Sequence, residues 1–222
     1  MRPVRVIFLG PPGTGKGTQA RRLSERLGLA ALSSGDTLRR EIKEGSEIGR
    51  QAERHVVSGG LAPDEIITRV MLAGIAKLGS NAGYVLDGFP RTTPQAEALE
   101  QGLNARGQRI DGVLDFELAD AEIIARIVGR RVCSQCGATY NIAFLPPRRA
   151  DVCDACGGGL AQRADDREDV IRTRLETYRA QTAPLIGHYA DQGLLFRIDA
   201  SGPAETVERA VVETVRALAE GE

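Results

Sequence analysis

The sequence predicts an α/β fold in which a parallel sheet of five strands is flanked by helices on both faces. Short apolar runs alternate with longer segments of helical periodicity along the 222 residues. The first apolar run enters a glycine-rich turn that is followed at once by a helical pattern. Hydrophobic residues make up 42% of the chain and charged residues 27%, proportions that suit a globular protein with a sizeable buried core.

The expected strands are short runs of mainly apolar residues. They span residues 4–9, 30–32, 84–86, 112–116 and 194–198. At least one helical segment separates each strand from the next, and strands joined in this way form a parallel sheet with helices on its faces.

The helical patterns lie between these strands, and several carry signals for a first turn. They span residues 16–27, 36–44, 48–57, 63–78, 94–106, 120–128, 168–191 and 204–219. Asp36 can cap its helix, and Pro63 suits a first turn. Thr93 precedes Pro94 at the start of another helix. Residues 132–162 interrupt the alternation and are rich in Gly, Pro and Cys, so we interpret them as a small inserted module.

The overall charge argues against several classes of partner. The net charge is −1, aromatic residues make up only 4%, and Trp is absent, which disfavours binding to nucleic acid or to an anionic membrane. No apolar run reaches transmembrane length, and the run at residues 6–9 is too short for a signal peptide. We therefore expect a cytoplasmic protein that binds neither nucleic acid nor membrane.

The stretch GPPGTGKGT at residues 10–18 has the features of a phosphate-binding loop. Gly10, Gly15 and Lys16 fit the pattern G-x-x-x-x-G-K between an expected strand and an expected helix. The glycines allow backbone N–H groups to surround phosphate oxygens, and the helix N-terminus adds the positive end of its dipole. Lys16 can reach the β and γ phosphates of a nucleotide.

One position departs from this P-loop pattern. Gly17 stands where Ser or Thr usually offers a hydroxyl to Mg²⁺, and Thr18 follows it. We therefore expect the ion to be held mainly by substrate phosphates and waters. Asp87, which follows the apolar run 84–86, is the candidate carboxylate for orienting those waters, although Asp at this place could instead cap a turn.

A P-loop alone fits ATPases, GTPases and small-molecule kinases. The three lysines of the chain lie at positions 16, 43 and 77, and none belongs to the Asn-Lys-x-Asp segment with which GTPases read their base. GTPases are therefore disfavoured.

All four cysteines lie in two Cys-x-x-Cys pairs. These are Cys133 with Cys136, and Cys153 with Cys156. Their spacing is that of a closed four-sulfur zinc site, which has a structural role because no coordination position is left for substrate. A redox motif, disulfides and a zinc ribbon for nucleic acid are alternatives, and iron could occupy the same sulfurs.

Five segments occur in an order that resembles the adenylate kinases, in particular the long bacterial form with a metal-binding lid. They are GPPGTGKGTQ, LSSGDTLRR, LDGFPRT, GRR and QRADDRED, and the resemblance covers essentially the whole chain. It implies phosphoryl transfer from Mg-ATP to AMP, giving two ADP, by a monomer. It also implies a P-loop core of residues 1–32, 63–129 and 166–222 with two mobile insertions. The insertion 33–62 would bind AMP, and the lid 130–165 would carry zinc.

The resemblance also assigns roles to individual residues. The ATP-binding residues would be Gly13, Thr14, Gly15, Lys16, Gly17, Thr18, Arg126, Arg130, Thr139, Tyr140 and Gly202. The AMP-binding residues would be Ser34, Arg39, Gly60, Leu61, Ala62, Gly88, Phe89, Pro90, Arg91, Gln95, Arg163 and Arg174. The catalytic cations would be Lys16, Arg91, Arg130, Arg163 and Arg174. Where the family's Thr usually precedes Gly-Asp, this chain has Ser34, which keeps the hydroxyl.

Two other functions remain open from the sequence. One is a kinase for a different nucleoside monophosphate, which assays with AMP, CMP, UMP and dTMP would separate. The other is a nucleotide-switched binding module whose lid docks a partner protein. That module would hydrolyse ATP slowly and without any dependence on AMP.

Overall fold

Five parallel strands form the central sheet of the protein, and they confirm the predicted fold class. The computed structural model describes residues 2–221. Across the sheet the strands are β2 (Ala30–Ser33), β3 (Tyr84–Asp87), β1 (Arg5–Leu9), β4 (Gly112–Glu117) and β8 (Leu195–Asp199). Each neighbouring pair is parallel. Because β1 is central, its carboxyl end places the P-loop in the middle of one sheet edge.

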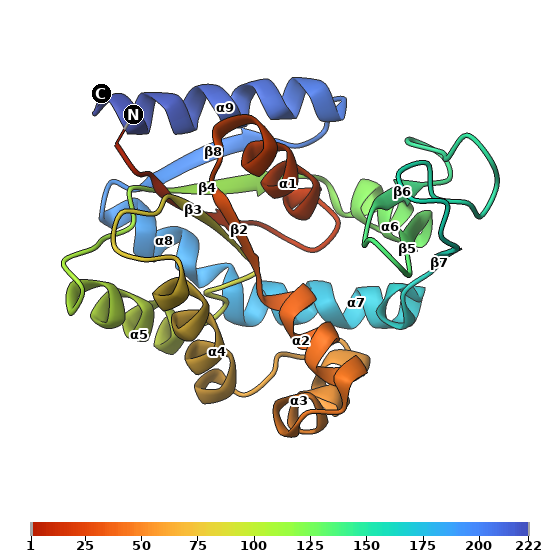
Figure 1. Ribbon diagram of the computed structural model, residues 1–222, viewed down its shortest axis with the longest axis horizontal. Coiled ribbons are helices and arrows are strands. Elements are labelled where there is room, and N and C mark those ends of the chain that lie inside the picture. Colours follow the sequence, from red (N-terminus) through yellow and green to blue (C-terminus); the bar gives the residue numbers. More distant parts are fainter. Residues whose placement is uncertain (1, 222) are drawn as a thin grey trace.

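Helices cover both faces of this sheet (Figure 1). They are α1 (Lys16–Leu27), α2 (Ser34–Glu44), α3 (Glu47–Val57), α4 (Asp64–Lys77), α5 (Thr93–Asn104), α6 (Asp120–Val128), α7 (Glu168–Thr177), α8 (Pro184–Asp191) and α9 (Ala204–Glu220). Alternate residues of β1 face opposite layers: Val6 and Phe8 pack with α1 and α9, whereas Ile7 and Leu9 pack with α4, α5 and α8. Within residues 2–221, no helix combines the length and apolar character needed to span a membrane.

The predicted helix 168–191 is not continuous. A π-helical turn, η2 (Tyr178–Thr182), separates α7 from α8, and the N–H of Ala183 donates to the carbonyl of Tyr178 at 2.8 Å. Pro184 has no N–H and its ring would crowd the carbonyl four residues earlier, so a regular α-helix cannot run through this point without a wider turn.

Three predicted helix-start signals were misplaced by one to three residues. Ser33, rather than Asp36, caps α2, since its Oγ accepts the N–H of Asp36 at 3.3 Å. Thr92, rather than Thr93, caps α5 by accepting the N–H of Gln95 at 3.3 Å. Pro63 occupies the cap position before α4 instead of its first turn. The first of these shifts matters most, because it leaves the Asp36 carboxylate available for ion pairs.

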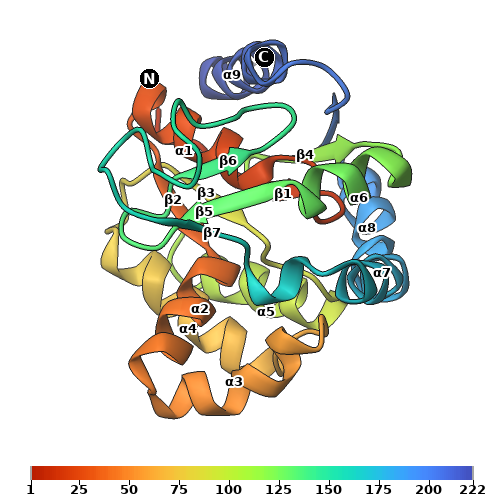
Figure 2. The same ribbon diagram turned by 90° about the vertical axis from the view of Figure 1, so that its right-hand side faces the viewer.

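A second, smaller sheet lies at the right-hand end of the molecule in Figure 1, which is the end that faces the viewer in Figure 2. Its antiparallel strands are β5 (Arg130–Cys133), β6 (Thr139–Asn141) and β7 (Leu160–Ala161), with β5 in the middle. A short 3₁₀ turn, η1 (Ala164–Asp166), leads from this small sheet back to α7. The helices α2 and α3 project from the other side of the site, so the two excursions from the core face each other across the P-loop edge (Figure 1).

Candidate active site

A cavity of about 670 Å³ lies at the carboxyl ends of the central strands. Its walls come from the P-loop, α2, the segment after β3, α6, β6 and α7. This edge of a parallel sheet is where open α/β proteins bind their ligands.

The backbone of the P-loop requires its glycines. Gly10, Gly13 and Gly15 have φ angles of 127°, 86° and 93°, a region that residues with a Cβ rarely adopt. A Cβ at Gly13 would also lie 2.7 Å from Cγ1 of Ile127 in α6. The loop therefore curves tightly and directs the N-terminus of α1 into the cavity.

The Lys16 ammonium is held inside this loop. Its Nζ donates to the carbonyl oxygens of Gly10 at 2.7 Å and Pro11 at 2.6 Å. Burial lowers the pKa of Lys16 to about 8, against the opposing effect of the nearby Asp87 carboxylate. The site thus holds a partly dehydrated cation where phosphate oxygens are expected, and such a charge interacts more strongly than one in water.

Asp87 ends β3 directly beside the P-loop. Burial raises the pKa of Asp87, while the positive charges of Lys16 and Arg91 oppose that rise. A Cβ at Gly17 would lie only 3.2 Å from Oδ2 of Asp87, so the residue that departs from the P-loop pattern leaves room for this carboxylate. A carboxylate in this place suits the waters of a nucleotide-bound Mg²⁺.

Arg91 is positioned by the turn that follows β3. Its Nε donates to the carbonyl of Gly88 at 2.8 Å, and the Oγ of Ser34 donates to the same oxygen at 2.5 Å. A Cβ at Gly88 would lie 2.7 Å from Nη2 of Arg91 and 2.8 Å from Oγ of Ser34. Gly88 is therefore needed for the close approach of these two side chains.

Four further arginines gather around three carboxylates at the rim of the cavity. Arg39 of α2 pairs with Asp36 at 2.6 Å, and Arg163 approaches the same oxygen at 3.6 Å. Asp165 pairs with Arg174 of α7 at 3.0 Å. Arg130 of β5 forms an ion pair with the fully buried Asp166.

These arginines lie close enough together for the positive charge of one to lower the pKa of another. Burial, joined by the positive charges of Arg39 and Arg130, lowers the pKa of Arg163 to about 10. Burial likewise lowers the pKa of Arg174 to about 10, although Asp165 opposes it. Both groups remain charged at neutral pH, so the cavity keeps a surplus of positive charge that a polyanion would neutralise.

A smaller cavity of about 60 Å³ adjoins the first. Gly60, Leu61 and Ala62 form part of its wall, opposite Gln95 of α5. Gln95 is held in one orientation, since its Oε1 accepts the N–H of Arg91 at 2.8 Å and its Nε2 donates to Asp64 at 2.6 Å. A fixed amide beside a small cavity of mixed polar and apolar lining suits recognition of a planar ligand with polar edges.

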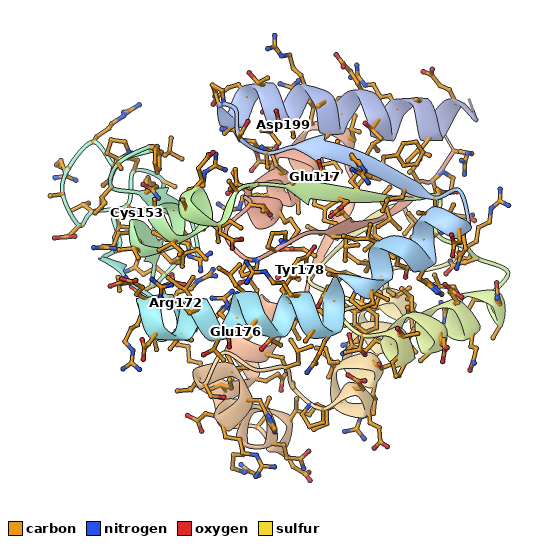
Figure 3. All side chains as sticks on the ribbon, turned by 180° about the vertical axis from the view of Figure 1, so that it is seen from behind. Glu117, Cys153, Arg172, Glu176, Tyr178 and Asp199 are labelled. Carbon is orange, nitrogen blue, oxygen red and sulfur yellow. The ribbon has the colours of Figure 1, made fainter. Side chains whose placement is uncertain are left out.

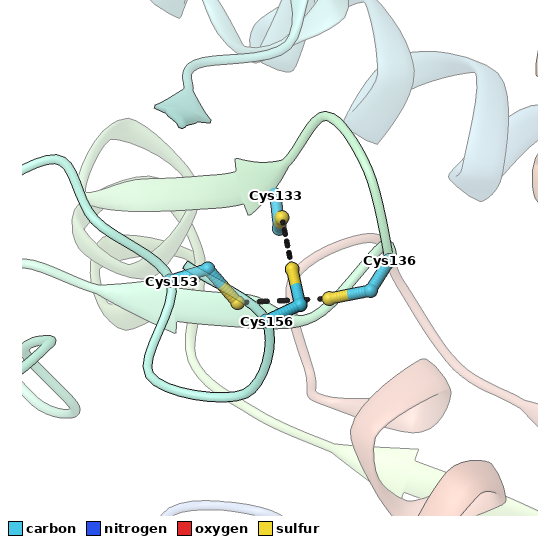
Figure 4. Close-up of side chains that lie close together, drawn as sticks. All are labelled: Cys133, Cys136, Cys153 and Cys156. Carbon is cyan, nitrogen blue, oxygen red and sulfur yellow. Dashed lines mark hydrogen bonds between the residues drawn. The ribbon is translucent and has the colours of Figure 1, made fainter. Parts of the chain in front are cut away.

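The four cysteines converge in the small sheet (Figure 4). Cys133 Sγ lies 3.5 Å from Cys156 Sγ, and Cys136 Sγ lies 3.6 Å from Cys153 Sγ. All four sulfurs lie within 4.8 Å of one another. Tetrahedral Zn–S bonds of about 2.3 Å would place sulfurs about 3.8 Å apart, so this donor set fits a zinc ion.

The comparisons with known proteins agree with one another. The family model described as "Adenylate kinase" matches residues 8–194. A protein of Moorella thermoacetica named "Adenylate kinase" is 48% identical over 198 residues, covering 89% of this chain and 91% of that protein. One of Citrifermentans bemidjiense with the same name is 45% identical, covering 96% and 100%. One of Methanococcoides burtonii, also so named, is 42% identical, covering 96% and 98%.

The chain belongs to the adenylate kinase family. It is therefore an enzyme of a phosphotransferase family, as the sequence motifs predicted.

Most of the residues singled out by the resemblance to the adenylate kinase family line the two cavities. Those on the larger cavity are Gly13, Thr14, Gly15, Lys16, Gly17, Thr18, Arg39, Leu61, Asp87, Gly88, Pro90, Arg91, Arg126, Arg130, Thr139, Tyr140, Arg163, Arg174 and Gly202. Ser34, Gly60, Ala62 and Gln95 line the smaller one. Phe89 lines neither, because its side chain is fully buried in the core beneath the turn.

The sequence did not reveal some of the lining residues. Thr177, Tyr178 and Thr182 reach the larger cavity from the end of α7 and the π-helical turn. In Figure 3, Tyr178 lies on the side of this helix that faces the sheet. The signal that could have found them is Pro184, which predicts an irregular turn just before it. Asp64, which orients Gln95, carried no sequence signal because it reaches this residue from the start of a different helix.

Proposed function

We propose that the chain catalyses the reversible transfer of a phosphoryl group from Mg-ATP to AMP, giving two ADP and so balancing the adenine nucleotides. The observation that carries this proposal is the convergence of arginines from α2, β5, α7 and the turn after β3 on a P-loop cavity with a second cavity beside it. An ATPase needs to hold one set of phosphates, whereas a kinase for nucleotides needs cations for two.

ATP would bind along the P-loop and under the small sheet. Residues 13–18 would surround its phosphates, and Arg130 would reach them from β5. Arg126, whose Nη2 donates to the carbonyl of Ser201 at 3.3 Å, would stack on the adenine next to Gly202. Thr139 and Tyr140 would close the site from β6.

AMP would occupy the side of α2 and the smaller cavity. Its adenine would lie against the backbone of residues 60–62, where Gln95 can bond to the polar edge of the base. Its phosphate would meet Arg39 and Arg91, with Ser34, Gly88 and Pro90 shaping the turn between them.

Transfer would depend on charge and position rather than on a covalent intermediate. Lys16, Arg91, Arg130, Arg163 and Arg174 would stabilise the negative charge of the phosphoryl group in flight. When bound with ATP, Mg²⁺ supplies further neutralisation of the phosphates. Asp87 would hold its waters, since Gly17 has no hydroxyl to offer.

The two excursions from the core, residues 33–62 and 130–165, would move as separate units around the bound nucleotides. The ion pairs of Asp36 with Arg163, and of Arg39 with Asp165 at 3.9 Å, run between them. Closure of both units would exclude water from the phosphates. The cysteines would hold one structural zinc in the lid. The family resemblance favours a cytoplasmic monomer.

The decisive measurement is the formation of ADP from ATP and AMP by the purified protein. We expect ATP consumption to require AMP, because water alone does not fill the second phosphate position. Parallel reactions with CMP, UMP and dTMP give the matched controls. ATP hydrolysis that is equally fast with and without AMP would contradict the proposal, and a preference for another monophosphate would redirect it to that substrate.

Replacing Arg39 by alanine should weaken the binding of AMP much more than that of ATP. A charge-assisted hydrogen bond to phosphate is worth a free energy that corresponds to about 10- to 100-fold in the dissociation constant for AMP. Separate titrations with each nucleotide measure this. Arg40→Ala is the control, because Arg40 is exposed and next in sequence. Equal losses for both nucleotides in Arg39→Ala would mean that α2 does not belong to the AMP site.

A further inference from the structure

We propose that the hydroxyl of Tyr140 holds the Cys153 thiolate in place for the lid metal, and that Tyr140 thereby couples the metal site to the ATP-binding cavity. The inference rests on the proposed function, since it needs both a metal in the lid and a nucleotide in the cavity. It assigns to Tyr140 a positioning role in addition to lining the cavity.

The contacts of the hydroxyl carry the first half of this inference. Tyr140 is 9% exposed and belongs to the small hydrophobic cluster of the lid with Cys133 and Cys153. Its oxygen lies 3.4 Å from Cys153 Sγ and accepts the N–H of Asp154 at 2.8 Å. A phenol has a single proton, so with Asp154 as donor to its oxygen that proton is available for the sulfur.

This geometry makes one hydroxyl the link between the second Cys-x-x-Cys turn and β6. Groups that hydrogen-bond to metal ligands orient them, and their loss typically lowers metal affinity by about 10- to 100-fold. Because a ligating cysteine is a thiolate, it accepts a stronger hydrogen bond from the phenol O–H than a thiol would.

The second half of the inference, the coupling of the metal site to the ATP-binding cavity, rests on Tyr140 and its neighbour in β6. Tyr140 itself lines the larger cavity. The next residue, Asn141, donates from Nδ2 to the carbonyl of Arg126 at 2.8 Å, and it pairs with Arg130 across the β5–β6 ladder. A displacement of the turn that contains Cys153 therefore also displaces Tyr140 and the strand β6. This strand contains two of the proposed ATP contacts, Thr139 and Tyr140.

Coupling of this kind acts in both directions. If the metal favours the arrangement of β6 that binds ATP, then ATP must raise the affinity of the site for the metal, and we expect the tighter binding to appear as slower release. AMP, whose proposed cavity lies away from β6, should have a much smaller effect. The difference between the two nucleotides separates this route from a general stabilisation of the fold.

The test uses the full-length protein loaded with one equivalent of zinc, whose content is measured first. Metal release into an excess of a chelating dye is followed alone, with Mg-ATP and with AMP. In the parent protein we expect ATP to slow release by at least about fivefold. In Tyr140→Phe, which keeps the ring, we expect release about 10-fold faster or more, and an ATP effect below about twofold.

Tyr189→Phe is the matched control, since its hydroxyl is also buried and has no hydrogen-bond partner within residues 2–221. It should release metal like the parent. A cobalt-loaded sample adds a second readout, because the thiolate-to-metal absorption bands should shift in Tyr140→Phe. Failure of Tyr140→Phe to load metal while the core still melts cooperatively would also support the inference.

Release rates and cobalt bands in Tyr140→Phe that match those of the parent would overturn the role of the hydroxyl. Equal effects of ATP and AMP on the parent would overturn the coupling. A parent protein that binds no metal at all would instead contradict the proposed lid metal, so the two failures can be told apart.

Discussion

Replacing Lys16 by alanine should lower turnover by about 10²- to 10³-fold while the fold stays intact. The ammonium lies inside the P-loop, held by the carbonyls of Gly10 and Pro11, in a place where phosphate charge must be stabilised. Lys43 and Lys77, both within the described residues 2–221, do not line the cavity. Steady-state rates of ADP formation, together with thermal melting, measure both parts of this prediction.

The pKa of Lys16 sharpens the expectation. Burial lowers it to about 8, so the folded state binds its proton less tightly than the unfolded chain does. The buried charge therefore costs stability below pH 8, and the cost disappears as the pH rises through the folded pKa toward the unfolded one. The variant should melt no lower than the parent at pH 7.

In the parent, kcat/KM should fall as the pH rises above about 8, because the cation is lost.

Lys77→Ala gives the matched control, since Lys77 is exposed at the end of α4. It should leave turnover and its pH dependence unchanged. Near-normal turnover in Lys16→Ala would remove this residue from the proposed chemistry. A large fall in its melting temperature would show that the lysine is needed for the fold instead.

Replacing Cys153 by serine should lower the thermal midpoint clearly while turnover at low temperature stays within about tenfold of the parent. Within residues 2–221, the hydrophobic cluster of the small sheet has Cys133, Tyr140 and Cys153 as its buried members, with Ala138 and Leu160 beside them. So small a cluster cannot support a fold of its own, and metal binding can supply about 10 kcal/mol in small peptides. A lid anchored to the core at both ends should need less than that.

Elemental analysis and melting curves test this expectation, with one zinc per chain predicted for the parent. Chelation should reproduce the loss of stability without any mutation. Ser134→Ala is the control, because its Oγ donates to the Gly159 carbonyl at 3.2 Å rather than to a sulfur. A metal-free parent would overturn the structural zinc, as would unchanged melting in the variant. Complete loss of turnover in a well-folded variant would point to a metal with a catalytic role.

The sequence predicted those parts of the molecule that depend on local patterns. The central strands follow from short apolar runs, and the P-loop follows from glycines whose positive φ angles the structure confirms. The cap of α2 was misassigned because Ser33 and Asp36 both suit a cap and differ only by three residues along the helix start. Local preference cannot separate two such candidates.

Contacts between distant segments could not be predicted from one sequence. The pairing of Asp36 with Arg163, and the contact of Tyr140 with Cys153, depend on how α2, β6 and the cysteine turns pack in space. Phe89 belongs to a motif carried over by resemblance, and its side chain lies fully buried in the core. A motif identifies a segment, but the direction of each side chain is decided by its surroundings.

The π-helical turn before Pro184 has a geometric consequence for the long helical rod of which it is part. One extra residue in a turn shifts the angular phase of everything after it by about 100°. With that shift, Arg174 lines the cavity, whereas Leu185 and Tyr189 are buried in the hydrophobic core on the face of the sheet that α4, α5 and α8 cover. Without it, residues 11 apart such as Arg174 and Leu185 would share one side of the rod. The added residue thus lets one helical segment place a charged side chain in the cavity and, further along, apolar side chains in the core.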